Sequence, residues 1–80
     1  MMNVTYGVTE EIYSLGISSR TSYGIAAYAD SEENGTATIV ASIHDVTTDK
    51  RALNELVSLC NRLELSTIHL LDVVEDFLAS

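Results

Sequence analysis

The stretch that decides the fold is residues 47–80, TTDKRALNELVSLCNRLELSTIHLLDVVEDFLAS. Its apolar residues recur at helical spacing in two runs that meet near Ser66. In the second run, at about 100° per residue, the apolar residues share one side of a helix. They are Leu70, Leu71, Val74, Phe77 and Leu78. We therefore expect two adjacent amphipathic helices, either antiparallel or sharply crossed, because only a short link at residues 64–66 joins them.

The first of these two helices carries an apolar stripe of its own. Its residues are Leu53, Leu56, Val57, Cys60 and Leu63. We expect the helix to begin at Thr47 or Thr48, with Asp49 in its first turn, because hydroxyl side chains cap helix N-termini and anions are favoured there. Ser66 is the expected N-cap of the second helix for the same reason.

The charges at the helix ends predict how the helices are oriented. Lys50 and Arg51 lie at the N-terminus of the first helix, where cations are unfavourable. Glu75 and Asp76 lie near the C-terminus of the second, where anions are unfavourable. An antiparallel arrangement would bring the two groups together. We therefore expect ion pairs between the helices, each worth about 0.2–1 kcal/mol because such pairs are exposed.

A β-hairpin is expected before the helices, because residues 3–46 are rich in Thr, Tyr, Val, Ile and Ala. The sequence Glu33-Asn34-Gly35 marks its turn. A three-residue loop there gives apolar cross-strand pairs: Ile25 with Ile43, Ala27 with Ala41 and Ala29 with Ile39. A two-residue turn at Asn34-Gly35 would instead pair apolar with polar residues. The three-residue loop, with Gly35 in a bulge position, is therefore favoured.

An earlier strand is expected near the N-terminus. Its apolar residues change parity, from Val4, Tyr6, Val8 and Ile12 to Tyr13, Leu15 and Ile17. This change predicts a bulge or bend at residues 9–11, and residues 18–22 are expected to link the strand to the hairpin. The predicted fold is α+β: a three-stranded antiparallel β-meander followed by a C-terminal αα-hairpin packed on one sheet face, in a single domain over residues 1–80.

Composition limits the classes of partner. The chain has 80 residues, with 12 acidic and 4 basic side chains and a formal net charge of −8. Such a surface repels phosphate backbones and anionic lipids, so we expect no nucleic-acid or membrane partner. No apolar run approaches the roughly 18 residues of a membrane span, and the N-terminus lacks the features of a signal peptide. The single cysteine, Cys60, fits a reducing, cytoplasmic location.

The polar face of the second helix is the first candidate site. It consists of His69, Asp72, Glu75 and Asp76. Imidazole and carboxylate groups bind divalent metals, but ligands along one helix do not converge on one ion without help from another element. His44 and Asp45 are the obvious helpers. A solvated helix face is the simpler interpretation, so no metal or other cofactor is predicted. A metal-binding protein or enzyme that uses His69, Asp72 and Asp76 is the alternative.

Three further features have both a functional and a structural interpretation. His44-Asp45 is a candidate general-base pair, but no glycine-rich elbow or oxyanion motif accompanies it. Tyr28 is expected on the sheet face opposite the core, beside Ala26 and Val40, where it would form an apolar contact surface. Cys60 falls on the apolar stripe of the first helix and is expected to be buried rather than reactive.

Three segments resemble a known family. They are the run at residues 59–78, LCNRLELSTIHLLDVVEDFL, and the shorter Tyr23-Gly24-Ile25-Ala26 and Asp45-Val46-Thr47-Thr48-Asp49. They are similar to a family of small uncharacterised proteins from clostridia-type bacteria, over roughly residues 20–79. The resemblance implies a domain of unknown function and supplies no catalytic residues. It draws attention to the polar positions Asn61, His69, Asp72, Glu75 and Asp76.

Together these observations predict a non-enzymatic cytoplasmic module that binds or regulates another protein. The sequence carries no Walker loop, dinucleotide fingerprint or zinc-ligand pair. A domain of this size has a thin core, which favours association with a protein partner or with a second copy as a homodimer. The candidate binding residues are His69, Asp72, Glu75, Asp76 and Tyr28.

Overall fold

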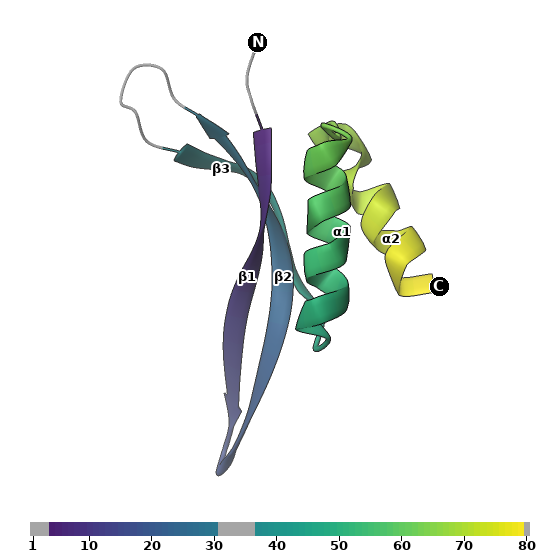
Figure 1. The fold of residues 1–80 in the computed structure, drawn as a ribbon. Helices are drawn as coiled ribbons and strands as arrows, with labels where there is room; N and C mark the ends of the chain where they lie inside the picture. Colours follow the sequence, from purple (N-terminus) through teal and green to yellow (C-terminus); the bar gives the residue numbers. More distant parts are fainter. Residues whose placement is uncertain (1–3, 31–36, 80) are drawn as a thin grey trace.

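The fold is an open antiparallel sheet with two helices on one side (Figure 1). The computed structural model describes residues 4–30 and 37–79. Its elements in chain order are β1 (Val4–Leu15), β2 (Ser18–Asp30), β3 (Ala37–Thr47), α1 (Lys50–Arg62), the 3₁₀ turn η1 (Thr67–His69) and α2 (Leu70–Ala79). The strand order is β1-β2-β3. The predicted α+β fold, a meander followed by a helical pair on one sheet face, is confirmed.

The core lies between the sheet and the helices because alternate residues of β1 and β2 are apolar on that face. Tyr6, Ile25 and Ala27 are buried there. The helices add the buried residues Leu53, Val57, Cys60, Leu70 and Val74. Not every residue of the predicted apolar stripes is buried. Leu63, Leu71 and Leu78 are exposed, so each helix buries a narrower face than the sequence predicted.

The β2–β3 register agrees with the prediction at its centre and differs at one end. Ile25 pairs with Ile43 and Ala27 pairs with Ala41, as expected. The predicted partner of Ala29, Ile39, is wrong: a register shift between Ala27 and Tyr28 pairs Ala29 with Thr38 and Tyr28 with Ile39. Such a bulge inserts an extra residue and moves later side chains to the other face. The predicted turn at Glu33-Asn34-Gly35 lies outside the described residues.

The β1–β2 hairpin corrects two expectations. Its pairing is continuous from Val4–Ala29 to Leu15–Ser18, so the bulge predicted at residues 9–11 does not occur. The link is not at residues 18–22, which belong to β2, but at Gly16 and Ile17. Gly16 has a φ of 65°. A positive φ at the first of two turn residues matches a type II′ turn, in which glycine is favoured.

A second irregularity lies where β3 approaches its end. The pairing shifts between Tyr23–Thr47 and Ile25–Ile43, and Asp45 within this bulge has a φ of 54°. Opposite the bulge, a Cβ on Gly24 would lie 2.5 Å from the carbonyl oxygen of Ile43. Only glycine therefore fits at position 24 without displacing the backbone of β3.

The helix ends are defined by backbone and side-chain hydrogen bonds. Asp49, not Thr47 or Thr48, is the N-cap of α1, and its Oδ1 accepts from the Ala52 N–H at 3.1 Å. At the C-terminus, the N–H groups of Glu64 and Leu65 donate to the carbonyls of Asn61 and Cys60. With Glu64 at a φ of 50°, this is a Schellman motif. Ser66 is the N-cap of η1, but its side chain forms no capping bond.

Asn61 of α1 ties the helix to the outer edge of the sheet. Its Oδ1 accepts from the Tyr6 N–H at 2.7 Å, and its Nδ2 donates to the Tyr6 carbonyl at 3.0 Å. The Tyr6 hydroxyl donates to the Leu65 carbonyl at 2.7 Å. The amide thus takes the place of a neighbouring strand at Tyr6, and the backbone groups there are satisfied.

The ion pairs predicted between the helices do not form. Within residues 4–30 and 37–79, the ion pairs join Arg20 to Asp45 and His44 to Glu11, all outside the helices. Lys50 instead lies over the ring of Tyr23, with its Nζ 5.8 Å from the ring centroid. The two helices do run in opposite directions (Figure 1), so the predicted orientation holds and only the ion pairs are wrong. Exposed ion pairs contribute too little to hold long side chains in one geometry.

Candidate functional site

Three strongly exposed apolar residues lie on the distal end of the β1–β2 hairpin, which we call the arm (residues 12–21). β3 ends its pairing at Tyr23, so the arm is a two-stranded ribbon that projects beyond the rest of the sheet (Figure 1). Ile12, Leu15 and Ile17 are 69%, 70% and 109% exposed. Residues 12–19 carry no charged side chain. The side chains of a two-stranded ribbon have no core to pack against. Such a ribbon is therefore only marginally stable on its own.

A polar network holds the base of the arm on the sheet face turned away from the helices. Oε1 of Glu11 lies 2.9 Å from His44 Nδ1, and Oε2 accepts from the Tyr13 hydroxyl at 2.5 Å. These hydrogen bonds, that of Tyr13 first, lower the pKa of Glu11. The same bond to Glu11 is the main reason that the pKa of Tyr13 is raised.

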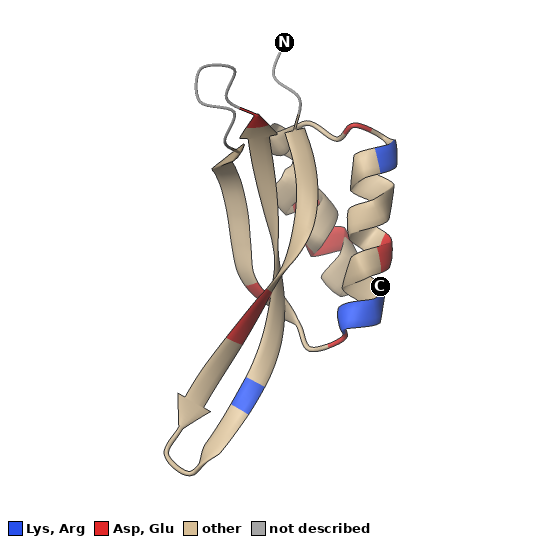
Figure 2. Ribbon diagram, turned by 60° about the vertical axis from the view of Figure 1, so that its left-hand side comes forward, with Lys and Arg blue, Asp and Glu red and all other residues tan. Residues whose placement is uncertain are grey.

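Asp45 forms the second half of this network. The Ser22 hydroxyl donates to Asp45 Oδ1 at 2.5 Å, and Arg20 pairs with Oδ2 at 3.1 Å. The hydrogen bond from Ser22 and the charge of Arg20 lower the pKa of Asp45. Arg20 also lies 5.4 Å from the centroid of the Tyr13 ring, which joins the two halves. The charged residues of this network thus come from β1, β2 and the β3 bulge, at the point where the arm leaves the sheet (Figure 2).

The network does not have the geometry of a nucleophilic active site. In a Ser-His-Asp relay the imidazole lies between the hydroxyl and the carboxylate. Here Ser22 bonds directly to Asp45, and the imidazole of His44 contacts Glu11 instead. Ser22 is also fully buried, so a substrate could not reach its hydroxyl. The two members of the candidate general-base pair thus form separate contacts, His44 with Glu11 and Asp45 with Ser22.

The predicted polar face extends from the end of η1 along α2 and is exposed. The side chains in question are His69, Asp72, Glu75 and Asp76, all of which are exposed. They lie on the helical side of the sheet, whereas His44 and Asp45 contact residues of the opposite face. Within the described parts of the chain, no three His, Cys, Asp or Glu side chains are grouped as a metal site would require. The structure therefore does not bring together the ligands that the metal alternative needs.

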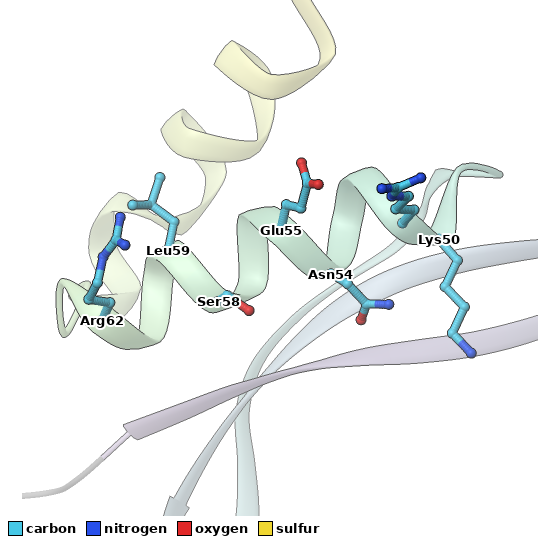
Figure 3. Close-up of a pocket in the computed structure, with 7 residues that line it drawn as sticks. Lys50, Asn54, Glu55, Ser58, Leu59 and Arg62 are labelled. Atoms are coloured by element: carbon cyan, nitrogen blue, oxygen red, sulfur yellow. The ribbon is translucent and has the colours of Figure 1, made fainter.

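The outer surface of α1 gathers three of the four basic side chains. A shallow groove there is lined by Lys50, Arg51, Asn54, Glu55, Ser58, Leu59 and Arg62 (Figure 3). All of these residues belong to one helix, so no second element closes the groove. It resembles an ordinary polar helix surface more closely than a ligand pocket, which is concave and mostly apolar.

Tyr28 lies on the outer sheet face, as predicted, and its ring covers Gly7. A Cβ on Gly7 would lie 3.4 Å from Tyr28 Cε2. Ala26 is almost completely buried on this face, but Ile39 and Val40 at the edge of the sheet are exposed. The exposed apolar side chains near Tyr28 are thus Ile39 and Val40 of β3, and a contact surface there stays a prediction.

Cys60 is buried in the core. Burial raises the pKa of its thiol, because the thiolate would lose its hydration there. The thiol is therefore protonated and inaccessible at neutral pH, as expected of a packing residue.

Sequence reasoning missed the arm and its polar base. The arm was missed because apolar residues at both parities suggested a bent buried strand. The signal that identifies it is Gly16, a turn glycine placed between two uncharged β-prone segments. The network was missed because Glu11, Ser22 and Asp45 are far apart in sequence and meet only through the strand register.

The fold and its contacts define a small α+β domain with an exposed β-arm. The chain belongs to a family of unknown function, DUF6514, whose family model matches residues 1–80. The resemblance to a domain of unknown function is thus confirmed, and it extends over the whole chain. No curated protein and no solved structure matches. In the described part of the chain, none of the helices has the length and apolar character needed to cross a membrane.

Proposed function

We propose that this chain is a non-enzymatic, cytoplasmic protein-binding or regulatory module that contacts another protein through the arm. The observation that carries the proposal is the exposure of Ile12, Leu15 and Ile17 on a ribbon without a core. Exposed apolar residues scattered singly are ordinary, but a projecting uncharged group of them is typical of a contact surface.

The polar base of the arm supports the same proposal. A ribbon whose base is held by hydrogen bonds to Glu11 and Asp45 loses less conformational freedom when it binds. The turn at Gly16 and Ile17 leaves the Ile17 side chain fully exposed at the tip. The arm is therefore suited to insert Ile17 into an apolar recess of a partner.

Two further observations support the non-enzymatic and cytoplasmic parts of the proposal. The hydroxyl and carboxyl groups most suited to catalysis, Ser22 and Asp45, bond to each other and hold the arm. The one cysteine is a buried free thiol, which suits a reducing compartment.

Site-specific photo-crosslinking in cells tests the proposal. A photoreactive residue at position 17 should give a discrete crosslinked product, and one at Ser58, an exposed residue of α1, should not. Adding Leu15→Lys should remove the product, because the charge would be buried in the contact. Leu15 is exposed, so this variant should melt like the parent. Equal products from positions 17 and 58, or a product that survives Leu15→Lys, would contradict the arm as the contact surface.

A further inference from the structure

The side chain of Glu11 reaches from the edge strand β1 across the central strand to β3. Its Oε1 lies 2.9 Å from Nδ1 of His44, and the same oxygen lies 3.0 Å from the position that a Cβ on Gly24 would occupy. The carboxylate therefore lies over the bare backbone of Gly24, where a side chain would crowd it. This contact joins the two outer strands of the sheet beside the residue at which the arm begins.

The two members of this contact differ in their exposure. The side chain of Glu11 is 21% exposed, whereas that of His44 is 70% exposed. The hydroxyl of Tyr13 also donates to the carboxylate, so the position of Glu11 does not depend on the imidazole alone. The imidazole is open to solvent, and its protonation therefore follows the pH of the solution.

The charged and titratable groups around the imidazole keep their charge near neutral pH. They are Glu11 and Tyr13 of β1, Arg20 of β2 and Asp45 of β3. The hydrogen bond from Tyr13 is the main cause that lowers the pKa of Glu11, and the one from Ser22 is the main cause for Asp45. The pKa of Tyr13 is raised by its bond to Glu11, and a guanidinium keeps its proton. Histidine, in contrast, is the side chain whose charge changes between about pH 5 and pH 8.

We propose that Glu11 and His44 form a pH-sensitive latch, which holds the base of the arm more firmly below neutral pH than above it. With the imidazole protonated, the contact is a charge-assisted hydrogen bond, about twice as strong as the neutral bond that can remain after the proton is lost. The contribution of the latch is therefore present below the imidazole range and falls as pH rises through it. At still lower pH the carboxylates themselves gain protons, which has the opposite effect on the arm.

The latch regulates the surface that carries Ile17, so its consequence for binding rests on the proposed function. An arm that is held firmly before it binds loses less conformational freedom in the complex. The arm should therefore bind a protein partner more tightly at mildly acidic than at mildly alkaline pH. The latch itself is a property of the chain alone and can be measured without a partner.

Hydrogen exchange of the full chain tests the latch at about pH 5.5 and about pH 8, on either side of the imidazole range. Protection of the arm amides is expressed relative to the intrinsic exchange rate at the same pH. In the parent, this protection should be about two- to fivefold greater at the lower pH, the range expected of an exposed ion pair.

His44→Gln should remove the difference between the two pH values, because a glutamine has no charge to gain. The matched control is His69→Gln, which replaces the other histidine of the chain and should leave the difference as in the parent. Both histidines are exposed, so both variants should fold like the parent.

Equal protection of the parent arm at the two pH values would overturn the latch, and so would a difference that survives His44→Gln. A difference that is lost in His69→Gln would likewise overturn it and would place the response at η1. Because the chain is measured without a partner, failure of the latch leaves the crosslinking result unaffected. Failure of the crosslink would in turn leave the exchange result unaffected.

Discussion

The two halves of the β1–β2 hairpin have similar strand sequences and opposite environments. In the half nearest the helices, Tyr6 and Ile25 are buried beneath α1, which also bonds to the β1 edge through Asn61. In the arm, Ile12 and Leu15 are exposed although the ladder continues without a break. Backbone pairing alone is therefore not what makes a strand part of the core. The covering helix decides which apolar residues stabilise the fold and which are available for contact.

Truncation of one isoleucine in each half should separate these roles most strongly. Ile25→Ala should lower the free energy of unfolding by about 2–5 kcal/mol, because it leaves a cavity in the core. Ile17→Ala should change it by less than about 0.5 kcal/mol, since the side chain is fully exposed. Urea denaturation followed by circular dichroism measures both. Similar losses in the two variants would mean that the arm is packed in solution.

The junction between the halves is tested by Gly24→Ala. The new Cβ would lie 2.5 Å from the Ile43 carbonyl oxygen, so the β3 bulge must move. We expect a loss of about 1–3 kcal/mol, typical of overpacking. Gly7→Ala is the control, because its Cβ would meet only the Tyr28 ring at 3.4 Å and φ is not positive there. Equal melting temperatures for the two variants would show that the bulge is not rigid.

Acidification should loosen the base of the arm without a comparable effect on the core. The pKa values of Glu11 and Asp45 are lowered by their hydrogen bonds in the folded state. Folding is therefore favoured above the ordinary carboxyl range, near pH 4, and this contribution is lost as pH falls through the lowered values. Below that range, the arm amides should lose protection against hydrogen exchange, measured relative to the intrinsic exchange rate at the same pH. Asp45→Asn should make this response smaller, and an unchanged response would exclude Asp45 as the holding group.

Much of the fold followed from local pattern. The helical spacing of residues 50–79 and the cross-strand pairs Ile25–Ile43 and Ala27–Ala41 were predictable, because one apolar face must be buried and a shift by one residue would expose it. The candidate polar residues of η1 and α2, which are His69, Asp72, Glu75 and Asp76, are exposed, and their role as a binding site stays a prediction. What failed were the ion pairs between helices and the limits of the first strand, where weak local signals were interpreted without knowledge of the neighbours.

The sequence by itself determined the kind of each element, the side that each helix buries and the acidic character of the surface. These properties depend on the residue types and on periods of about 3.6 and 2 residues. Only the tertiary structure decided that β3 ends before the arm and that Asn61 closes the β1 edge. Those outcomes depend on how far one strand extends relative to another, and a pattern within one strand carries no information about the length of its neighbour.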